Sequence, residues 1–222
     1  MNAPQGSEVR YILSDHAQGT PEWKQDRHGR ATGSRAADIL AKIKSGEAAA
    51  RRDYRVQLAV ERLTGAPAED GYINKEMEWG TAQEPFSRMA FEAATGLLVQ
   101  EAGFAYLPDI QAGCSVDGFI DDDGRKGLFE TKSPKSATHI SYLLANRLPP
   151  AYEPQVMFNM WITGAQFADF ASFDPRMPEG LQLFLVRVER DEKRIIEIQA
   201  ETVVFLQEVD TLVTKLRERI HG

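Results

Sequence analysis

The sequence has a single cysteine, Cys114, among its 222 residues. One thiol cannot form a disulfide within the chain, and it excludes a zinc or iron–sulfur site held by several cysteines. No run of about 18 or more apolar residues occurs, so we expect no membrane-spanning helix and no membrane partner. The stretch MNAPQGSEVR lacks the apolar core of a signal peptide. Together these absences favour a cytoplasmic protein in a reducing compartment.

Other kinds of site are missing as well. The four histidines have neither the spacing of a metal site nor a partnering nucleophile, and we expect surface or packing roles for them. No glycine-rich phosphate loop follows a predicted strand, which argues against ATP use. The composition, 42% hydrophobic and 27% charged, is that of an ordinary globular chain.

Charge is distributed unevenly along the chain. The net charge is −7, which by itself argues against nucleic acid as a partner. Residues 23–62, however, hold ten Lys and Arg against five acids, so this segment carries +5 and the remainder −12. Such an asymmetry fits a protein that binds a polyanion on one surface. A helix face solvated by charged side chains would give the same pattern.

Apolar periodicity, capping residues and breakers predict an alternation of helices and strands. We expect helices at about 34–46, 49–64, 74–96, 136–145, 153–162 and 201–220, with Ser34 and Asn74 as N-caps and a kink near Gly80 and Pro85. Strands are expected at about 98–106, 113–120, 127–132, 167–173, 182–189 and 194–199. The pattern predicts one α/β domain of the α+β type, with a central mixed, mostly antiparallel sheet flanked by helices. Its parts are a helical segment at about 20–96, a core at about 97–200 and a C-terminal helix at about 201–220.

The segment GCSVDGFIDDDGRKGLFETK, residues 113–132, predicts a β-hairpin. Asp123-Gly124 between apolar-rich runs is a strong signal for a two-residue turn. With this turn, Asp117 lies opposite Glu130, and Lys132 lies on the same face because side chains alternate along a strand. Two carboxylates facing each other repel and destabilise a sheet, so a cation between them would explain the pair.

These residues suit a hydrolytic metal site. Mg²⁺ takes carboxylate, carbonyl and water ligands, which Asp117, Glu130 and the backbone carbonyl of Thr131 can supply. A bound metal makes water a better nucleophile, and Lys132 can orient that water or stabilise charge on an attacked phosphate. A solvated acidic hairpin without any metal remains the alternative at this point.

The chain resembles the bacteriophage lambda exonuclease family, the YqaJ-type viral recombinases of the PD-(D/E)xK nuclease superfamily. The matching segments follow family order and span most of the chain: WKQDRHGRATGS (23–34), WGTAQEP (79–85), CSVDG (114–118), LFETKSP (128–134), PQVMFNMWITG (154–164), DPRM (174–177) and ERDEK (189–193). One departure is Val116, which stands where the motif name has proline.

The resemblance implies a restriction-endonuclease-like core and a 5′→3′ exonuclease acting on double-stranded DNA ends. Such an enzyme digests one strand processively from a 5′-phosphorylated end and leaves 3′ single-stranded DNA. It also implies Mg²⁺ as the cofactor, replaceable by Mn²⁺, with two ions in each active site. A ring-shaped homotrimer and a single-strand annealing protein are the implied partners.

The resemblance also assigns roles to individual residues. Asp117 and Glu130 match the metal carboxylates and Lys132 the catalytic lysine. Glu84 matches an acidic residue that joins the site from a helix, although an ordinary exposed helix glutamate is the alternative. Gln155 matches a glutamine beside the lysine, with polar packing as the alternative.

Three further residues match the family's 5′-phosphate pocket. Arg27 matches the arginine that holds the phosphate, a role that suits the two parallel donors of a guanidinium. Ser34 is expected at a helix N-terminus, where free N–H groups favour anions. Ser115, two residues before Asp117 and on the same strand face, matches a pocket hydroxyl. As an alternative, Arg27 would be a surface ion-pair partner of Asp26 or Glu22.

Two other functions stay open on the sequence. One is a structure- or site-specific DNA endonuclease of the same superfamily, which would cut a covalently closed circle. The other is a DNA-binding protein without catalysis, against which the complete set of Asp117, Glu130, Lys132 and Glu84 argues.

Overall fold

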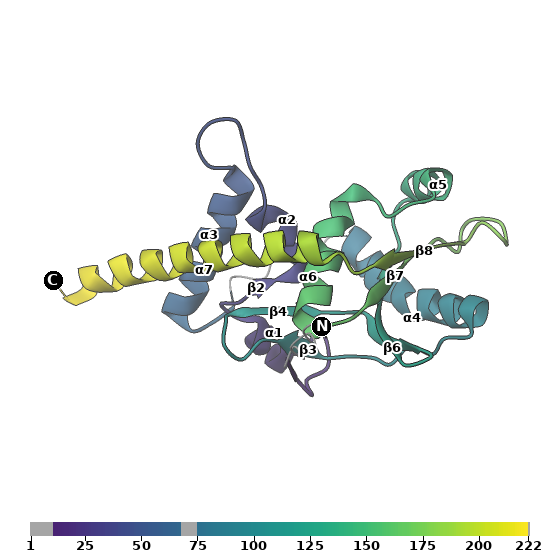
Figure 1. The fold of residues 1–222 in the computed structure, drawn as a ribbon, viewed down its shortest axis with the longest axis horizontal. Coiled ribbons are helices and arrows are strands. Elements are labelled where there is room, and N and C mark those ends of the chain that lie inside the picture. The colour runs from purple at the N-terminus through teal and green to yellow at the C-terminus, as the bar shows by residue number, and fades with distance from the viewer. Residues whose placement is uncertain (1–10, 68–74, 222) are drawn as a thin grey trace, which may run out of the picture.

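The computed structural model describes residues 11–67 and 75–221, which form two four-stranded sheets with helices around them (Figure 1). The strand order is β1-β3-β4-β2 in the first sheet and β5-β6-β7-β8 in the second. Both sheets are mixed, because β2–β4 and β6–β7 are parallel while the other pairs are antiparallel. The strands are β1 (Ile12–Leu13), β2 (Ala31–Thr32), β3 (Phe104–Tyr106), β4 (Ala112–Ser115), β5 (Gly118–Asp122), β6 (Arg125–Lys132), β7 (Phe167–Phe173) and β8 (Leu183–Glu189).

The helices cover both sheets and confirm the predicted mixed α/β class. They are α1 (Pro21–Arg27), α2 (Ala36–Ile39), α3 (Ala49–Thr64), α4 (Lys75–Thr95), α5 (Ser136–Ala145), α6 (Glu153–Thr163) and α7 (Glu192–His221), with 3-10 turns at Gly33–Arg35 and Pro150–Tyr152. Helices α4 and α5 pack on the second sheet, and α3 packs against α7 (Figure 1). Among the helices described, none is both long enough and apolar enough to cross a membrane.

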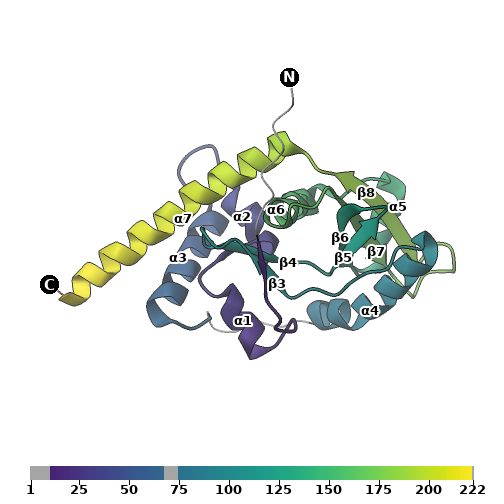
Figure 2. The ribbon, with the colours of Figure 1, turned by 60° about the horizontal axis from the view of Figure 1, so that its bottom comes forward.

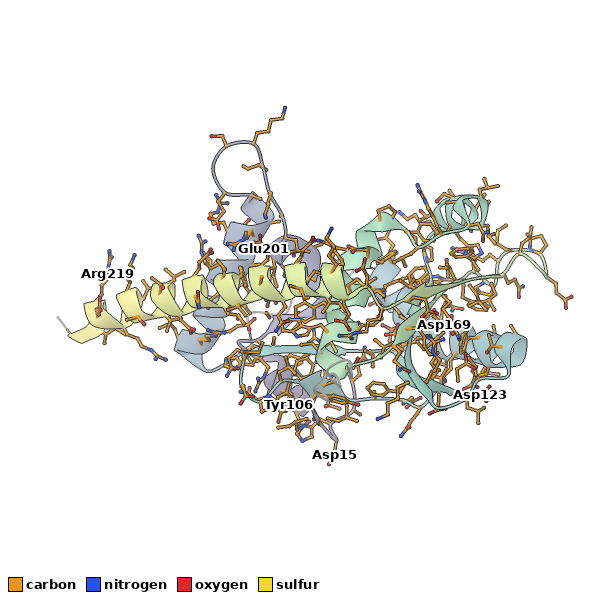
Figure 3. The ribbon with its side chains drawn as sticks, viewed as in Figure 1. Asp15, Tyr106, Asp123, Asp169, Glu201 and Arg219 are labelled. Carbon is orange, nitrogen blue, oxygen red and sulfur yellow. The ribbon has the colours of Figure 1, made fainter. Side chains whose placement is uncertain are left out.

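The hairpin between β5 and β6 has the predicted register. Asp123 and Gly124 both have positive φ, 52° and 84°, as a tight turn between twisted antiparallel strands requires. Gly118 pairs with Phe129, and the register continues pair by pair to Asp122 and Arg125. Asp123 lies at the outer end of the hairpin and Arg219 near the free end of α7, on opposite sides of the molecule (Figure 3).

The expected strand 113–120 is wrong as one continuous strand. Val116 and Asp117 are not in a strand. They separate β4, which belongs to the first sheet, from β5, which belongs to the second. The alternation of side chains along one strand had predicted that Ser115 and Asp117 share a face. This prediction is wrong, because the two residues do not lie on the same strand. Val116 is 1% exposed and belongs to the hydrophobic core, whereas Asp117 is half-buried.

Three other predicted elements also differ from the structure. Residues 194–199 are not a strand, because α7 already begins at Glu192, and Ile195 and Ile198 are buried one helical turn apart. The strand expected at 98–106 is limited to β3, although Gln100 forms an isolated bridge with Phe119. The helix expected at 34–46 shrinks to α2. The predicted cap Asn74 lies outside the described residues.

Helix α6 joins the two halves of the molecule. It contacts β3 and β4 of the first sheet, β7 of the second, and α7 (Figure 2). All of its residues from Val156 to Thr163 are buried, and it ends at Gly164, whose φ of 70° lets the chain turn away. A helix buried on every side fixes the positions of whatever polar residues it carries.

Helix α7 is held against α3 by ion pairs and by one aromatic stack. Phe205 is fully buried and stacks on Tyr54 with ring centroids 5.3 Å apart. Arg51 and Arg55 both donate to Glu208 on α7. The predicted apolar stripe continues beyond the body of the protein, since Leu216 and Ile220 are exposed.

We expect Phe205→Ala to lower the free energy of unfolding by about 3–5 kcal/mol, because it removes a fully buried ring and leaves a cavity beside Tyr54. The neighbouring Val204 is 49% exposed, so Val204→Ala should change stability by no more than roughly 0.5 kcal/mol. Urea unfolding of both variants measures the difference. Equal losses would contradict the packing of α7 described here.

Candidate active site

The carboxylate of Glu130 is the most enclosed charged group at this site. Glu130 lies on β6 and is only 2% exposed. Lys132 Nζ donates to its Oε1 over 2.5 Å, and Gln155 Nε2 donates to the same oxygen over 2.6 Å. Asn159 Nδ2 donates to Oε2 over 3.3 Å. Residues of β6 and α6 thus converge on one carboxylate.

Asp117 completes the predicted pair at the start of the hairpin. Its Oδ2 accepts a hydrogen bond from the backbone N–H of Thr131 over 2.7 Å, which holds it beside the strand that carries Glu130. The hydroxyls of Thr131 and Ser87 lie 2.5 Å apart and tie α4 to β6. Asp117 and Glu84 line one cavity of about 730 Å³.

Crowding of carboxylates changes the protonation of this site. Burial, followed by the charge of Asp117, raises the pKa of Glu84 to about 7. Burial also raises the pKa of Glu130, and the charge of Asp117 adds to this effect while Lys132 opposes it. Burial alone would lower the pKa of Lys132, but the charges of Glu130 and Asp117 raise it, so the lysine is a cation.

The oxygen-rich set fits a hard divalent cation. Within residues 11–67 and 75–221, no three His, Cys, Asp or Glu side chains are already gathered as a metal cluster. Mg²⁺ does not require such a cluster, because it keeps several waters and takes only one or two carboxylates from the protein. Asp117, Glu130 and the Thr131 carbonyl offer oxygen ligands. A bound cation would also relieve the repulsion between the acidic side chains, which favours its binding.

A second group of residues lies around Ser115. Its hydroxyl accepts hydrogen bonds from Arg27 Nη1 at 2.7 Å and from Trp23 Nε1 at 3.1 Å. The Arg27 guanidinium also lies 4.4 Å from the centre of the Trp23 ring. These two residues are one turn apart on α1, which starts with Thr20 as N-cap and Pro21 in its first turn. Arg27 makes no ion pair within the described part of the chain, which disfavours the expected alternative with Asp26 or Glu22.

Ser34 and Arg27 line the same cavity, which has a volume of about 800 Å³. Ser34 is not the helix N-cap that was predicted. It lies inside the 3-10 turn Gly33–Arg35, and α2 after it has only four residues. Tyr54 stabilises the start of this turn, because its hydroxyl accepts a hydrogen bond from the backbone N–H of Thr32 over 2.9 Å.

The two cavities adjoin each other. Trp23 and Met77 line both of them. An extended polymeric ligand in one cavity can therefore continue past these side chains into the other. The cavity of Asp117 and Glu84 also includes the exposed Asp15, which lies at the lower edge of the molecule in Figure 3.

Most of the basic segment has a structural role. Among the described residues, six of its cations form ion pairs with acids, four of them reaching α7: Lys42–Glu201, Arg51–Glu208, Arg55–Glu208, Arg62–Asp210, Arg35–Asp38 and Arg52–Asp53. Arg30 instead lies 4.4 Å from the ring of Tyr106 and, like Arg27, lines the 800 Å³ cavity. The positive surface is therefore much smaller than the charge count suggested.

The structure brings the predicted residues together in two sets. The first set lies at the hairpin and consists of Asp117, Glu130, Lys132 and Gln155. Glu84 lies on the wall of the cavity that Asp117 lines. Arg27 and Ser115 are hydrogen-bonded, and Ser34 faces the cavity of Arg27. Three contributors were not predicted from the sequence. They are Asn159, Ser87 and Trp23, which donates a hydrogen bond to Ser115. Asn159 follows Gln155 by four residues on α6, and that spacing was the available signal.

Comparisons with known proteins identify the family and related structures. Residues 22–166 match the family described as the YqaJ-like viral recombinase domain. The crystal structure of LHK-Exo, an alkaline exonuclease from Laribacter hongkongensis, is 37% identical, covers 91% of this chain and 98% of its own, and has a TM-score of 0.82. Its complex with dAMP gives 36% identity, the same coverage and a TM-score of 0.83.

Two further relatives are more distant or shorter. The uncharacterised protein ExoD of Escherichia coli (strain K12) is 34% identical over 67 residues, which cover 30% of this chain and 75% of ExoD. A phage related exonuclease from Haemophilus somnus 129PT is 18% identical with a TM-score of 0.63, covers 85% of this chain and 97% of its own, and shares the fold.

The raised pKa of Glu84 predicts how stability depends on pH in the metal-free protein. Because the folded state holds this proton more tightly than the unfolded chain, the contribution of Glu84 is complete below about pH 4.5 and is lost as the pH rises through about 7. Glu84→Gln should therefore lose less stability than the parent protein between about pH 5 and 8. Chemical unfolding in a chelator at several pH values is the measurement. Glu78→Gln on the exposed start of α4 serves as the control, and a parallel pH response of all three proteins would contradict the prediction.

Proposed function

Because the chain belongs to the YqaJ-like viral recombinase domain family, we propose that it is a DNA exonuclease of metal-dependent type. In this proposal it hydrolyses one strand of duplex DNA processively from a 5′-phosphorylated end, in the 5′→3′ direction. The product is a 3′ single strand for recombination by annealing.

One observation carries the proposal: Asp117, which is hydrogen-bonded to the strand of the Lys132–Glu130–Gln155 cluster, lines a cavity that adjoins the cavity of Arg27 and Ser34. The first cavity has the donors for a cation and the second has a guanidinium for an anion. A nucleic-acid end offers a scissile phosphate for the first and a terminal phosphate for the second. The exonuclease from Laribacter hongkongensis, which matches over nearly its full length, supports the same activity.

Each residue of the group around Asp117 and Glu130 has a proposed task. Asp117, Glu130 and the Thr131 carbonyl hold Mg²⁺, which Mn²⁺ can replace, and Glu84 helps to hold a second ion. When bound, the metal lowers the pKa of water and screens the charge of the phosphate. Lys132, kept protonated by the acids around it, donates to the charge that develops on the attacked phosphate. Gln155 fixes the Glu130 carboxylate and leaves it little freedom to rotate.

The Arg27 cavity gives the reaction its direction. A guanidinium with two parallel donors suits a terminal phosphate, and Ser115 already orients it. Each hydrolysis that leaves phosphate on the shortened strand supplies a new 5′-phosphate to the same cavity. Bond hydrolysis then drives movement along the strand without ATP.

The proposal extends to assembly. Processive digestion requires that the enzyme stay closed around DNA between cuts, and a homotrimeric ring would provide that closure. A single-strand annealing protein would receive the 3′ strand as it leaves.

Asp117→Asn is expected to reduce hydrolysis of linear duplex in Mg²⁺ by about 100-fold or more, because a charged oxygen ligand is lost. The amide oxygen can still accept the Thr131 N–H, so the fold should remain. Asp123→Asn at the hairpin turn is the matched control, since Asn-Gly suits the same turn, and should keep full activity. A covalently closed circle in the same assay tests the endonuclease alternative. Near-normal digestion by Asp117→Asn would remove the metal site from this account.

Arg27→Ala is expected to erase the preference for a phosphorylated 5′ end. Loss of a charge-assisted hydrogen bond should lower the rate at that end roughly 10- to 100-fold. The substrate is a duplex with one phosphorylated and one hydroxyl 5′ end. Arg52→Ala, which removes an exposed arginine paired with Asp53, controls for the general loss of positive charge. Equal attack on both ends by the parent protein would rule out the phosphate pocket.

A further inference from the structure

Asn159 is a second amide on the same buried helix face as Gln155, and it is 2% exposed. The two amides divide the Glu130 carboxylate between them. Gln155 donates to Oε1, which Lys132 also contacts, whereas Asn159 is the described side chain that donates to Oε2. Asn159 therefore restrains the one oxygen that the lysine does not.

The other end of the Asn159 amide points away from the carboxylate. Because Nδ2 donates to Glu130, Oδ1 of the same amide faces the opposite side. There Oδ1 is buried and has no hydrogen-bond partner within the described residues. It lies against Gly33 so closely that a Cβ placed on that glycine would be 2.0 Å from it.

Gly33 belongs to the turn of the phosphate cavity. It is buried and begins the 3-10 turn Gly33–Arg35, whose next residue is Ser34. Asn159 is thus wedged between the backbone of this turn and the carboxylate of Glu130. A side chain packed on two sides cannot move at one end without moving at the other.

We propose that Asn159 is a positioning residue that couples the phosphate-binding turn to the Glu130 carboxylate. The proposal rests on the function proposed above and deepens it. A 5′-phosphate held at Ser34 fixes the position of Gly33, Gly33 fixes the Asn159 amide, and the amide fixes the carboxylate that holds the cation. End recognition then raises the rate of the chemical step in addition to tightening binding.

The first test is a double-mutant cycle on the contact between Gly33 and Asn159. Gly33→Ala should lower Mn²⁺ affinity about 10-fold, because its methyl group displaces the amide that supports Glu130. In the background of Asn159→Ala, which leaves room for that methyl group, Gly33→Ala should have no further effect. Calorimetric titration with Mn²⁺ measures each protein. Gly80→Ala is the matched control, since its added methyl meets no atom within 4 Å.

The second test needs no change at Gly33. Asn159→Ala should reduce the ratio of single-turnover rates at phosphorylated and hydroxyl ends about 10-fold, while Arg27 still binds the phosphorylated duplex with unchanged affinity. Gln155→Ala touches the same carboxylate but not Gly33, so it should slow both ends by the same factor and keep the ratio.

The outcomes separate this proposal from the one it rests on. A parent protein without nuclease activity in Mg²⁺, or without preference for phosphorylated ends, would overturn the proposed function. A parent protein with that preference, and an Asn159→Ala variant that keeps it in full, would overturn the coupling alone. Additive losses of Mn²⁺ affinity in the double-mutant cycle would overturn it as well.

Discussion

Burial of the Glu130 carboxylate constrains much of the second sheet and the helix beside it. An ion taken out of water costs several kcal/mol unless good partners compensate it. Lys132 of the same strand and the two amides of α6 supply those partners, so β6 and α6 must be placed correctly relative to each other. Pairing of Lys132 with Ser172 in β6–β7 fixes the lysine, whereas packing of α6 fixes the amides. A shift of any one element would leave a charge or an amide unpaired.

Helix α6 meets this demand because apolar side chains surround its two site amides and are buried against both sheets and α7. Its last turns are anchored by Arg190, which donates to the carbonyl of Met160 and, over 3.2 Å, to that of Ala165. An arginine at a helix C-terminus also interacts favourably with the helix dipole. The segment ERDEK, in which Arg190 lies, therefore serves the active site from a distance through the end of α6.

Local chemistry explains which parts of this molecule could be predicted from the sequence. Asp-Gly with two positive φ angles sets the hairpin register, and the register alone aligns Asp117 with Glu130 and Lys132. Helix α3 ends at Gly65 as expected, because its αL conformation favours glycine. Arg27 and Ser34 came from resemblance, since no local pattern brings residues so distant in sequence to Ser115.

Tertiary contacts decided the features that were missed. The β-branched Ile195 and Ile196 favour a strand locally, but Ile195 and Ile198, three residues apart, are both buried in the core, which favours a helix here. The division into two sheets depends on how β4 pairs with β2 and β3, which the spacing of apolar residues does not reveal. Asn159 lies in the segment 154–164 and four residues after Gln155, but its uncharged side chain gave no sign of the contacts at each end of its amide, which only the tertiary structure shows.

The junction at Val116 bears on how much DNA the proposed exonuclease would remove in each cycle. Ser115 ends one sheet, Asp117 precedes the other, and two residues of extended chain span at most about 7 Å. In the proposed function, with the strand end held near Ser115 and the cut made at Asp117, this short link would limit each step to about a single nucleotide. Because Val116 in the middle of the link is buried, an insertion there would disturb the core, so the proposed step size would follow from the fold itself.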